Sequence, residues 1–195
     1  MKKDIILAGV GGQGILSIAA TIGTAAIQNG LYLKQAEVHG MSQRGGAVQS
    51  HLRLSSDAIY SDLIPLGKAD LIISIEPMES LRYINMLSAE GWLITNIHPE
   101  KNIPDYPDME TLLDEIQKVP RQIAIDSLKI ARENGSSKTA NIVTLGAASA
   151  HIGMDYESLK LAIKTIFQTK GEEIIKMNLE ALDAGRQFAH EYEKA

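Results

Sequence analysis

Hydrophobic residues gather in short runs that predict the strands of this protein. Ile5–Val10, Ala69–Glu76 and Gly91–Ile97 are largely continuous apolar runs, which are typical of strands buried on both faces of a sheet. Ala47–Leu54 instead alternates between apolar and polar side chains, and this period of two predicts a strand with one face in water. Further strands are expected at Leu31–Val38 and Arg121–Ile125.

Helical patterns separate these strands and fill the end of the chain. The first is rich in Ala, Ile and Leu and stops at Asn29-Gly30, a glycine signal for a helix C-terminus. No strand pattern remains from Thr139 onward. The alternation therefore predicts a three-layer α/β/α fold, with a Rossmann-like, mostly parallel sheet and a helical C-terminal third. The expected helices are Ile15–Gln28, Met78–Leu87, Met109–Lys118, Asp126–Asn134, Ala140–Ile152, Tyr156–Thr169 and Glu172–Tyr192.

Composition limits the chemistry that the chain can carry by itself. A length of 195 residues fits a single domain, expected to span residues 1–195. Because the sequence has no cysteine, disulfides, thiolate zinc sites, cysteine nucleophiles and cysteine-held iron–sulfur clusters are excluded. A net charge of −5 argues against non-specific nucleic-acid binding, and the five histidines show no metal-ligand spacing. No targeting or membrane-spanning pattern is visible, which predicts a cytoplasmic protein.

A glycine-rich turn joins the first expected strand to the first helix. Gly9–Gly14 reads GVGGQG and satisfies the G-x-G-x-x-G pattern of loops that bind dinucleotides. Glycines let the backbone approach a phosphate, and the free N–H groups at a helix start attract anions. Glu37 ends the next strand, roughly where a ribose-binding carboxylate would lie. Two interpretations stay open, a phosphate site and a tight structural turn without a ligand.

A second loop, His39–Gly46 (HGMSQRGG), follows the next expected strand. Ligands gather at the carboxyl ends of strands in open α/β sheets, so adjacent parallel strands would bring both glycine loops to one edge. Arg44 offers a planar fork suited to phosphate or carboxylate, while Ser42 and Gln43 add neutral hydrogen-bonding groups. The alternative is a solvent-facing loop in which Arg44 pairs with a nearby carboxylate.

The two loops together carry a resemblance to a known family. The segments Gly9–Leu16, Glu37–Gly46, Ser50–Leu54 and Ile64–Arg82, in this order, resemble the gamma-type domain of 2-oxoacid:ferredoxin oxidoreductases. The resemblance extends from residue 4 to about residue 190. Within the family, the wording HGMSQRGG and the length are most similar to the small (beta) subunits of indolepyruvate ferredoxin oxidoreductases.

The resemblance implies a part in an oxidative decarboxylation. A 2-oxoacid, here indolepyruvate or another aryl pyruvate, reacts with coenzyme A and oxidised ferredoxin to give acyl-coenzyme A, carbon dioxide and reduced ferredoxin. In the family, thiamine diphosphate with Mg²⁺ and iron–sulfur clusters carry this chemistry. This chain has no cysteine and no G-D-G pattern followed by the asparagine of a thiamine-diphosphate site. A large alpha subunit is therefore expected to hold these cofactors, and the chain alone would be inactive.

Rival hypotheses remain at this point. The substrate could be pyruvate, 2-oxoglutarate or a branched-chain 2-oxoacid, as in sister branches of the family. The chain could instead be a stand-alone NAD(P)-binding protein, or an assembly module without a ligand. If the resemblance holds, the two loops contact the phosphate side of coenzyme A or dock the partner subunit, and no metal is bound. The residues expected at this site are Gly9, Gly11, Gly12, Gln13, Gly14, Ser42, Gln43 and Arg44.

Overall fold

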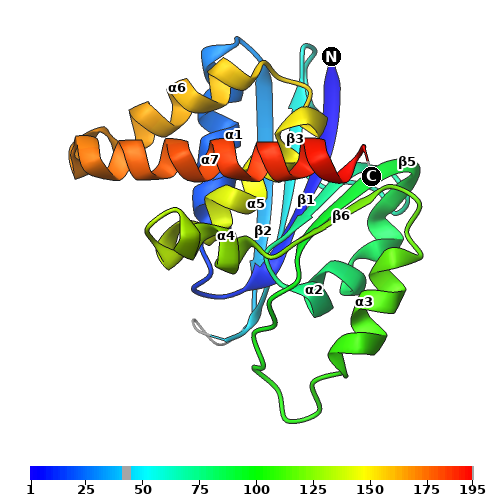
Figure 1. Cartoon of the computed structure of the whole chain (residues 1–195). Helices are drawn as coiled ribbons and strands as arrows, with labels where there is room; N and C mark the ends of the chain where they lie inside the picture. The colour runs from blue at the N-terminus through cyan, green and yellow to red at the C-terminus, as the bar shows by residue number, and fades with distance from the viewer. Residues whose placement is uncertain (41–44, 195) are drawn as a thin grey trace.

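A mixed six-stranded sheet forms the centre of the computed structural model, which describes residues 1–40 and 45–194 (Figure 1). The order across the sheet is β2-β3-β1-β4-β5-β6. Strands β1, β4, β5 and β6 pair in parallel, whereas β3 is antiparallel to both of its neighbours. The expected α/β fold is confirmed. The strands are β1 (Lys2–Val10), β2 (Tyr32–His39), β3 (Ala47–Ser55), β4 (Ala69–Ser74), β5 (Leu87–Asn96) and β6 (Gln122–Ile125).

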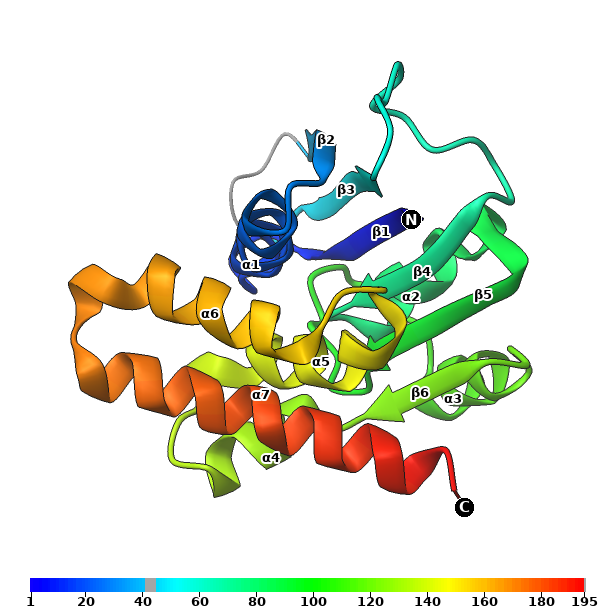
Figure 2. The same cartoon turned by 90° about the horizontal axis from the view of Figure 1, so that it is seen from above.

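Helices cover both faces of the sheet and give the three expected layers (Figure 2). Helices α2 (Pro77–Arg82) and α3 (Met109–Gln117) pack on one face, over a small core that includes Ile6, Ile72 and Leu93. The larger core lies on the other face, and the chain after β6 is helical as predicted. None of the helices in the described ranges is long and apolar enough to cross a membrane. The helices of the larger layer are α1 (Ile15–Gln28), α4 (Ser127–Glu133), α5 (Ala140–Ala148), α6 (Tyr156–Phe167) and α7 (Glu172–Tyr192).

Strand β3 lies between β1 and β2 and changes one expectation. The two strands that precede the glycine loops are parallel to each other, but they are not adjacent, because each pairs with β3 instead. Their C-terminal ends still reach the same edge of the sheet, since Val10 faces Ala47 and His39 faces Val48 across β3. Both glycine loops therefore begin at one edge, as the sequence predicted, although by a different route.

Two details of the sequence prediction are wrong. The face of β3 expected in water is largely covered, because the connection from β3 to β4 folds over it and leaves His51 only 8% exposed. The helix expected at Met78–Leu87 ends at Arg82, since a 3₁₀ turn follows it and β5 already begins at Leu87. Tertiary packing decides both outcomes, and local periodicity does not report it.

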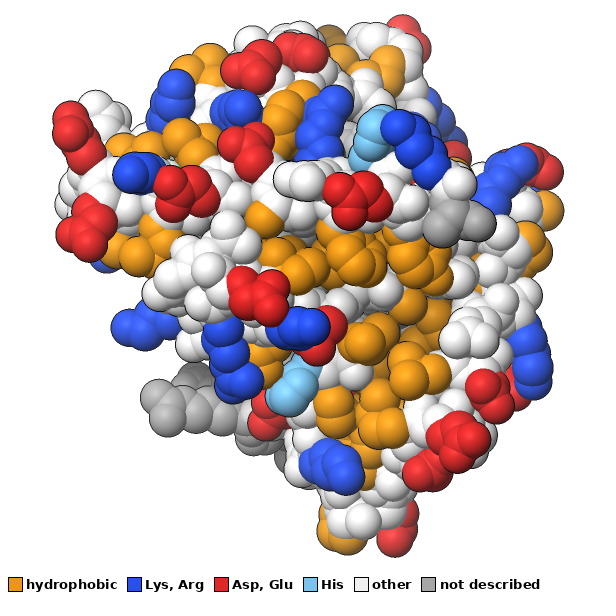
Figure 3. Space-filling model, in the orientation of Figure 1, with side chains coloured by type: hydrophobic (Ala, Val, Ile, Leu, Met, Phe, Trp, Pro, Cys, Tyr) orange, Lys and Arg blue, Asp and Glu red, His pale blue; other side chains and the backbone are white. Residues whose placement is uncertain are grey.

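The crossing of α5 and α7 is close because glycines lie at the contact. A Cβ at Gly146 would collide with the carbonyl of Leu182, and a Cβ at Gly185 would collide with the carbonyl of Val143. Both helices belong to the large core, where Leu145 and Ala181 are fully buried. The glycines thus allow the backbones to approach and complete the helical layer on this face of the sheet, where the outer surface of α7 carries acidic and basic side chains (Figure 3).

Gly185→Ala is expected to destabilise the fold, because its Cβ meets backbone that can give way only if a helix moves. Overpacking of this kind costs about 1–3 kcal/mol, and each kcal/mol lowers the melting temperature by about 2–4 °C in a chain of this size. Gly23→Ala in α1 is the matched control, since its Cβ would meet a flexible tip of Leu33 at 3.1 Å. Thermal unfolding of both variants measures the difference, and equal melting temperatures would contradict this account of the crossing.

Candidate functional site

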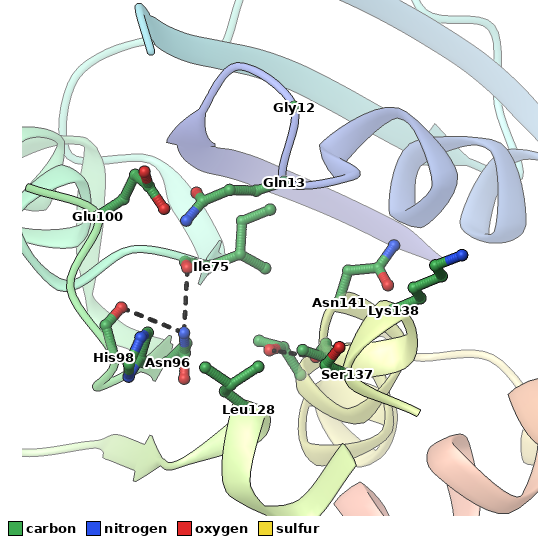
Figure 4. Close-up of a pocket in the computed structure, with 12 residues that line it drawn as sticks. Gly12, Gln13, Ile75, Asn96, His98, Glu100, Leu128, Ser137, Lys138 and Asn141 are labelled. Atoms are coloured by element: carbon green, nitrogen blue, oxygen red, sulfur yellow. Dashed lines mark hydrogen bonds between the residues drawn. The ribbon is translucent and has the colours of Figure 1, made fainter. Parts of the chain in front are cut away.

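A cavity opens at the C-terminal ends of the parallel strands. The chain leaves β1 toward α1 on one face and leaves β4 toward α2 on the other, and such a switch of face creates a crevice between the two strands. The cavity has a volume of about 280 Å³ and lies between the β1–α1 turn, the β5–α3 connection and the start of α5 (Figure 4). It is lined by Gly12, Gln13, Ile75, Asn96, His98, Glu100, Leu128, Ser137, Lys138, Ala140, Asn141 and Thr144.

The glycines of the first turn have different roles. A Cβ at Gly9 would lie 2.6 Å from Ile75 Cγ1, and a Cβ at Gly14 would lie 2.6 Å from Asn141 Nδ2, so close packing requires both glycines. Gly12 has a φ of 101°, and no described heavy atom lies within 4 Å of the position that its Cβ would take. The structural interpretation of the turn therefore explains Gly9 and Gly14, while Gly12 presents bare backbone at the cavity.

Gln13 holds the turn in shape. Its side-chain Oε1 accepts a hydrogen bond from the Val10 backbone N–H at 2.8 Å, and its backbone N–H donates to the Val10 carbonyl at 3.2 Å. The Asn141 side chain, at the first turn of α5, donates to the Gly14 carbonyl at 3.1 Å. The turn is thus fixed from within and from the opposite wall of the cavity, which preorganises the backbone around Gly12.

The second loop begins and ends against the first. Gly11 donates to the Gly46 carbonyl at 2.8 Å, and the Gly45 amide is 3.3 Å from the Gly11 carbonyl. Asn102, in the β5–α3 connection, donates to the Gly45 carbonyl at 2.6 Å. The expected residues Ser42, Gln43 and Arg44 lie outside the described residues, but the chain that flanks them is tied to the first turn and to one wall of the cavity.

Two side chains at the end of β2 line the approach to the first turn. His39 Nε2 lies 2.5 Å from Glu37 Oε1, and the other Glu37 oxygen accepts from Gln35 Nε2 at 3.1 Å. His39 also lines a second, smaller cavity beside Gly11 and Leu16. Glu37 does not occupy the position of a ribose-binding carboxylate, because β3 separates its strand from β1. The arrangement thus lacks one part of the dinucleotide site that the glycine pattern suggested.

A buried carboxylate positions the β5–α3 connection, which forms one wall of the cavity. Glu76 is fully buried, and its Oε1 accepts from the Glu100 amide at 3.3 Å and from the Tyr106 hydroxyl. Its Oε2 accepts from the Glu79 amide at 2.8 Å and caps α2. Burial, together with the hydrogen bond to Glu76, raises the pKa of Tyr106, so the hydroxyl stays protonated and remains a donor.

Asn96 joins three further segments at the floor of the cavity. Its Nδ2 donates to the carbonyls of Ile75 and His98 at 3.3 and 3.4 Å, and its Oδ1 accepts from the Ser127 amide at 3.1 Å. Figure 4 shows the first two of these bonds. The ends of β4 and β5 and the start of α4 are thereby held together, and this contact fixes the carbonyl of His98 at the rim.

The cavity is suited to binding a polar ligand. It is lined by residues with side-chain amides, by Lys138, His98 and Glu100, and by the open backbone at Gly12. Within the described ranges, no three His, Asp or Glu side chains lie close enough to hold a metal ion. Backbone N–H groups and a lysine are suited to a phosphate or carboxylate. Such groups orient a ligand, and no bond-making role has to be assigned to them.

Sequence reasoning missed most of the cavity walls. Of the expected residues, the structure places Gly12 and Gln13 at the cavity and Gly9, Gly11 and Gly14 in the turn behind it. Glu76, Asn96 and His98 follow or end buried strands, and polar residues at such positions were the available signal. Lys138 and Asn141 carry no comparable signal, because only the tertiary fold brings the start of α5 to this edge.

The fold and its crevice define a doubly wound α/β protein with a candidate site, the cavity described above, at the switch point of the sheet. Comparison with known proteins is more specific: the model of the pyruvate ferredoxin/flavodoxin oxidoreductase family matches residues 4–188, and the chain belongs to that family. Indolepyruvate oxidoreductase subunit IorB of Thermococcus kodakarensis is 38% identical, over 98% of both chains.

Other relatives carry the same unit within longer chains. Ketoisovalerate oxidoreductase subunit VorA of Methanothermobacter marburgensis is 30% identical over 94% of this chain, but the match spans 36% of that subunit. A solved 2-oxoglutarate:ferredoxin oxidoreductase from Magnetococcus marinus, with 2-oxoglutarate, coenzyme A and succinyl-CoA bound, has the same fold. It is similar with a TM-score of 0.76 and 24% identity, over 97% of this chain and 31% of that one.

Glu79, next to the carboxylate that positions the cavity wall, is also fully buried. Arg82 Nε donates to its Oε2 at 3.0 Å, while no described hydrogen-bond partner reaches its Oε1. Burial raises the pKa of Glu79 above its usual range, and the Arg82 guanidinium offsets only part of this rise. The folded protein thus holds the Glu79 proton more tightly than the unfolded chain does.

The wild-type protein is expected to lose stability as the pH rises and Glu79 ionises in its buried position. Glu79→Gln should abolish this loss, because glutamine does not ionise. Because the folded pKa lies above the unfolded one, the contribution of this proton is complete below the unfolded pKa and is lost as the pH rises through the folded pKa. The stability of the variant relative to the wild type should therefore increase from about pH 4 upward, where unfolded glutamates ionise. Urea unfolding over a pH series measures it, and a difference that is flat or falls with pH would refute the assignment.

Proposed function

We propose that this chain is the small subunit of a heteromeric oxidoreductase that converts an aryl pyruvate such as indolepyruvate to an acyl-coenzyme A. The observation that carries the proposal is the 38% identity with an indolepyruvate oxidoreductase subunit along nearly the whole of both chains. Family membership over residues 4–188 supports the 2-oxoacid oxidoreductase class as a whole. The particular 2-oxoacid rests on the relatives, since pyruvate, 2-oxoglutarate and branched-chain 2-oxoacids are used in sister branches.

The reaction divides between two subunits. The carboxylate of the 2-oxoacid leaves as carbon dioxide, the acyl carbon bonds to the sulfur of coenzyme A, and the electron pair that is released reduces ferredoxin. Iron–sulfur clusters need cysteine ligands, and this chain has none. We therefore assign the clusters, and thiamine diphosphate with its Mg²⁺, to a large subunit. The small subunit, residues 1–195 acting as one gamma-type domain, contributes binding groups.

The edge that carries both glycine loops is the part of this chain proposed to meet coenzyme A. The open backbone at Gly12 lines one cavity together with Lys138, and backbone N–H groups and lysines are both suited to a phosphate. A cavity of about 280 Å³ accommodates a part of coenzyme A and not the whole molecule. The coenzyme A bound in the Magnetococcus marinus enzyme supports this choice of ligand class. Arg44, in the second glycine loop, would add a guanidinium group that can bind a phosphate or carboxylate through two hydrogen bonds.

The purified chain alone is expected not to oxidise indolepyruvate, phenylpyruvate or pyruvate with a viologen acceptor, because it lacks the ligands for an electron-carrying cluster. Co-expression with a cognate large subunit should give coenzyme A-dependent activity that is higher with aryl pyruvates than with pyruvate or 2-oxoglutarate. Anaerobic viologen reduction measures both. Turnover by the isolated chain would refute the division of labour, and a preference for 2-oxoglutarate would refute the aryl substrate.

Arg44→Ala is expected to raise the KM for coenzyme A or for the 2-oxoacid by roughly tenfold to a hundredfold in the assembled enzyme. A lost charge-assisted contact is worth ~1.5–3 kcal/mol, which corresponds to that range. Arg44→Lys keeps the charge but loses the fork, so it should also weaken binding. Steady-state kinetics of the complex give both constants.

Arg186→Ala serves as the control for Arg44, because Arg186 lies in α7, in the helical layer, where its guanidinium is over the Tyr156 ring. Its kinetic constants should equal those of the wild type. If Arg44→Ala leaves both KM values unchanged while the subunits still associate, Arg44 does not contact either substrate. If association is lost but each assembled complex turns over normally, the second loop docks the partner instead.

A further inference from the structure

We propose that the connection between β3 and β4, residues 56–68, together with the uncovered face of β2, is the surface on which the large subunit docks. The inference rests on the proposed function only in taking a large subunit as the partner. The connection, which is the centre of this surface, lies at the opposite edge of the sheet from the glycine loops. The two roles that the sequence left open for those loops, ligand contact and docking, are thereby separated.

The connection exposes apolar side chains in close succession. Tyr60 is 94% exposed, Leu66 is 73% exposed and Leu63 is 56% exposed, although they lie within seven residues of one another. Single exposed apolar residues are ordinary on a protein surface, whereas a contiguous group of them marks an interaction site. Figure 2 shows this connection extending beyond the end of β3 before it returns to the start of β4.

The connection is held in place by a buried ion pair. Arg53 Nε donates to Asp4 Oδ1 at 2.7 Å, and its Nη1 donates to the carbonyls of Ser61 and Leu63, both at 3.0 Å. The Ile64 amide donates to His51 Nδ1 at 3.0 Å. Ile64 itself is 3% exposed and belongs to the small core. The exposed apolar side chains are thus displayed on a fixed backbone, which reduces the entropy lost when a partner binds.

Within the described residues, no helix covers β2 on the face of the sheet where the connection lies. Helices α2 and α3 pack on β1, β4, β5 and β6, whereas α1 packs on the other face of β2 and β3. Tyr32 and Val38 are therefore 56% and 60% exposed. They share a face with Lys34, whose Nζ is 3.4 Å from the Tyr60 carbonyl. Through this contact the uncovered face of β2 adjoins the connection.

Grooves flank the connection and can receive side chains of a partner. Both include Lys2, Asp4 and Arg53 in their walls. One continues along Leu54–Ser61 with a volume of about 440 Å³, and the other continues toward Ser88–Glu90 with about 720 Å³. Fixed apolar side chains next to concave surfaces are the usual composition of a binding hot spot.

The relatives indicate that the occupant is another part of the same enzyme. In the Methanothermobacter VorA subunit the matching unit makes up 36% of the chain, so a second, larger part of the enzyme is covalently attached to it. In the Thermococcus IorB subunit the matching unit makes up 98% of the chain, so the remaining part of such an enzyme lies on another chain, and the surface that it covers is expected to be apolar and exposed. The large subunit is therefore the partner that we assign to this surface.

The double variant Tyr60→Ser/Leu66→Ser tests the surface in the complex. A tagged cognate large subunit is immobilised, and the Kd of the purified small subunit is measured by biolayer interferometry. The variant is expected to bind at least tenfold more weakly, since two apolar anchors are removed. Its melting temperature should match that of the wild type, because both side chains are more than 70% exposed. The matched control is Ile27→Ser/Leu161→Ser, at residues 66% and 52% exposed on the helical layer, and its Kd should change less than twofold.

A third variant separates this surface from the glycine edge. Leu16→Ser changes a residue that is 55% exposed beside the first glycine turn, and it should leave the Kd unchanged. A weaker Kd for Leu16→Ser or for the control pair, with an unchanged Kd for Tyr60→Ser/Leu66→Ser, would overturn the proposal. The proposal would also be overturned if light scattering showed that the wild-type chain is a dimer and the Tyr60→Ser/Leu66→Ser variant a monomer, while both bind the large subunit equally well.

The outcome is distinguishable from failure of the proposed function. If association depends on Tyr60 and Leu66 but the complex does not oxidise aryl pyruvates, the docking surface stands and the substrate assignment falls. If the complex is active and the double variant associates normally, the function stands and the docking surface falls.

Discussion

The insertion of β3 between β1 and β2 is the constraint on which the candidate site depends. β3 pairs with β1 from Lys2↔Ser55 to Val10↔Ala47, and with β2 along the whole of that strand. Because β3 is antiparallel to β1 and β2, it begins at the edge of the sheet where both of them end. Gly46, which precedes β3, is therefore placed beside Gly11. In a dinucleotide fold β2 would neighbour β1 directly, whereas here Glu37 lies two strand spacings away, about 9–10 Å. The same glycine pattern is therefore found here in a different arrangement from that of a dinucleotide site.

Helix and strand positions could be predicted closely where the signals are local. The bounds of α1 and α7 follow the sequence prediction to the residue, because a glycine turn, an Asn-Gly stop and an amphipathic period mark them. The end of α2 could not be predicted, because the apolar residues that follow it continue the helical pattern. In the structure these residues form a 3₁₀ turn and the start of β5, and they pack into the small core. Burial of His51 could not be predicted either, since it depends on a connection that closes over β3 from outside the strand.

Only the glycine turn of the candidate site could be predicted from the sequence. The glycine turn is contiguous in sequence, so its residue types report its geometry directly. The opposite walls come from segments that are distant in the chain, and a single carboxylate organises one of them. Glu76 accepts from three donors, and it thereby couples the first turn of α2, in the small core, to the β5–α3 connection at the cavity. A charged residue in an apolar segment is a weak signal by itself, because burial and partners decide whether it has such a role.

The length of the strands separates the two edges that we assign to ligand and partner. β3 has nine residues, which corresponds to about 30 Å between the second glycine loop and the connection at residues 56–68. The proposed partner, to which we assign the electron-carrying cofactors, must nevertheless reach the glycine edge. The uncovered face of β2 runs from Tyr32 beside the connection to Val38 beside the second glycine loop, so one bound subunit can extend along it to both edges. Apolar contacts at the far edge can then supply the association energy, and the glycine edge, where affinity must allow substrate to enter and product to leave, is free to remain polar.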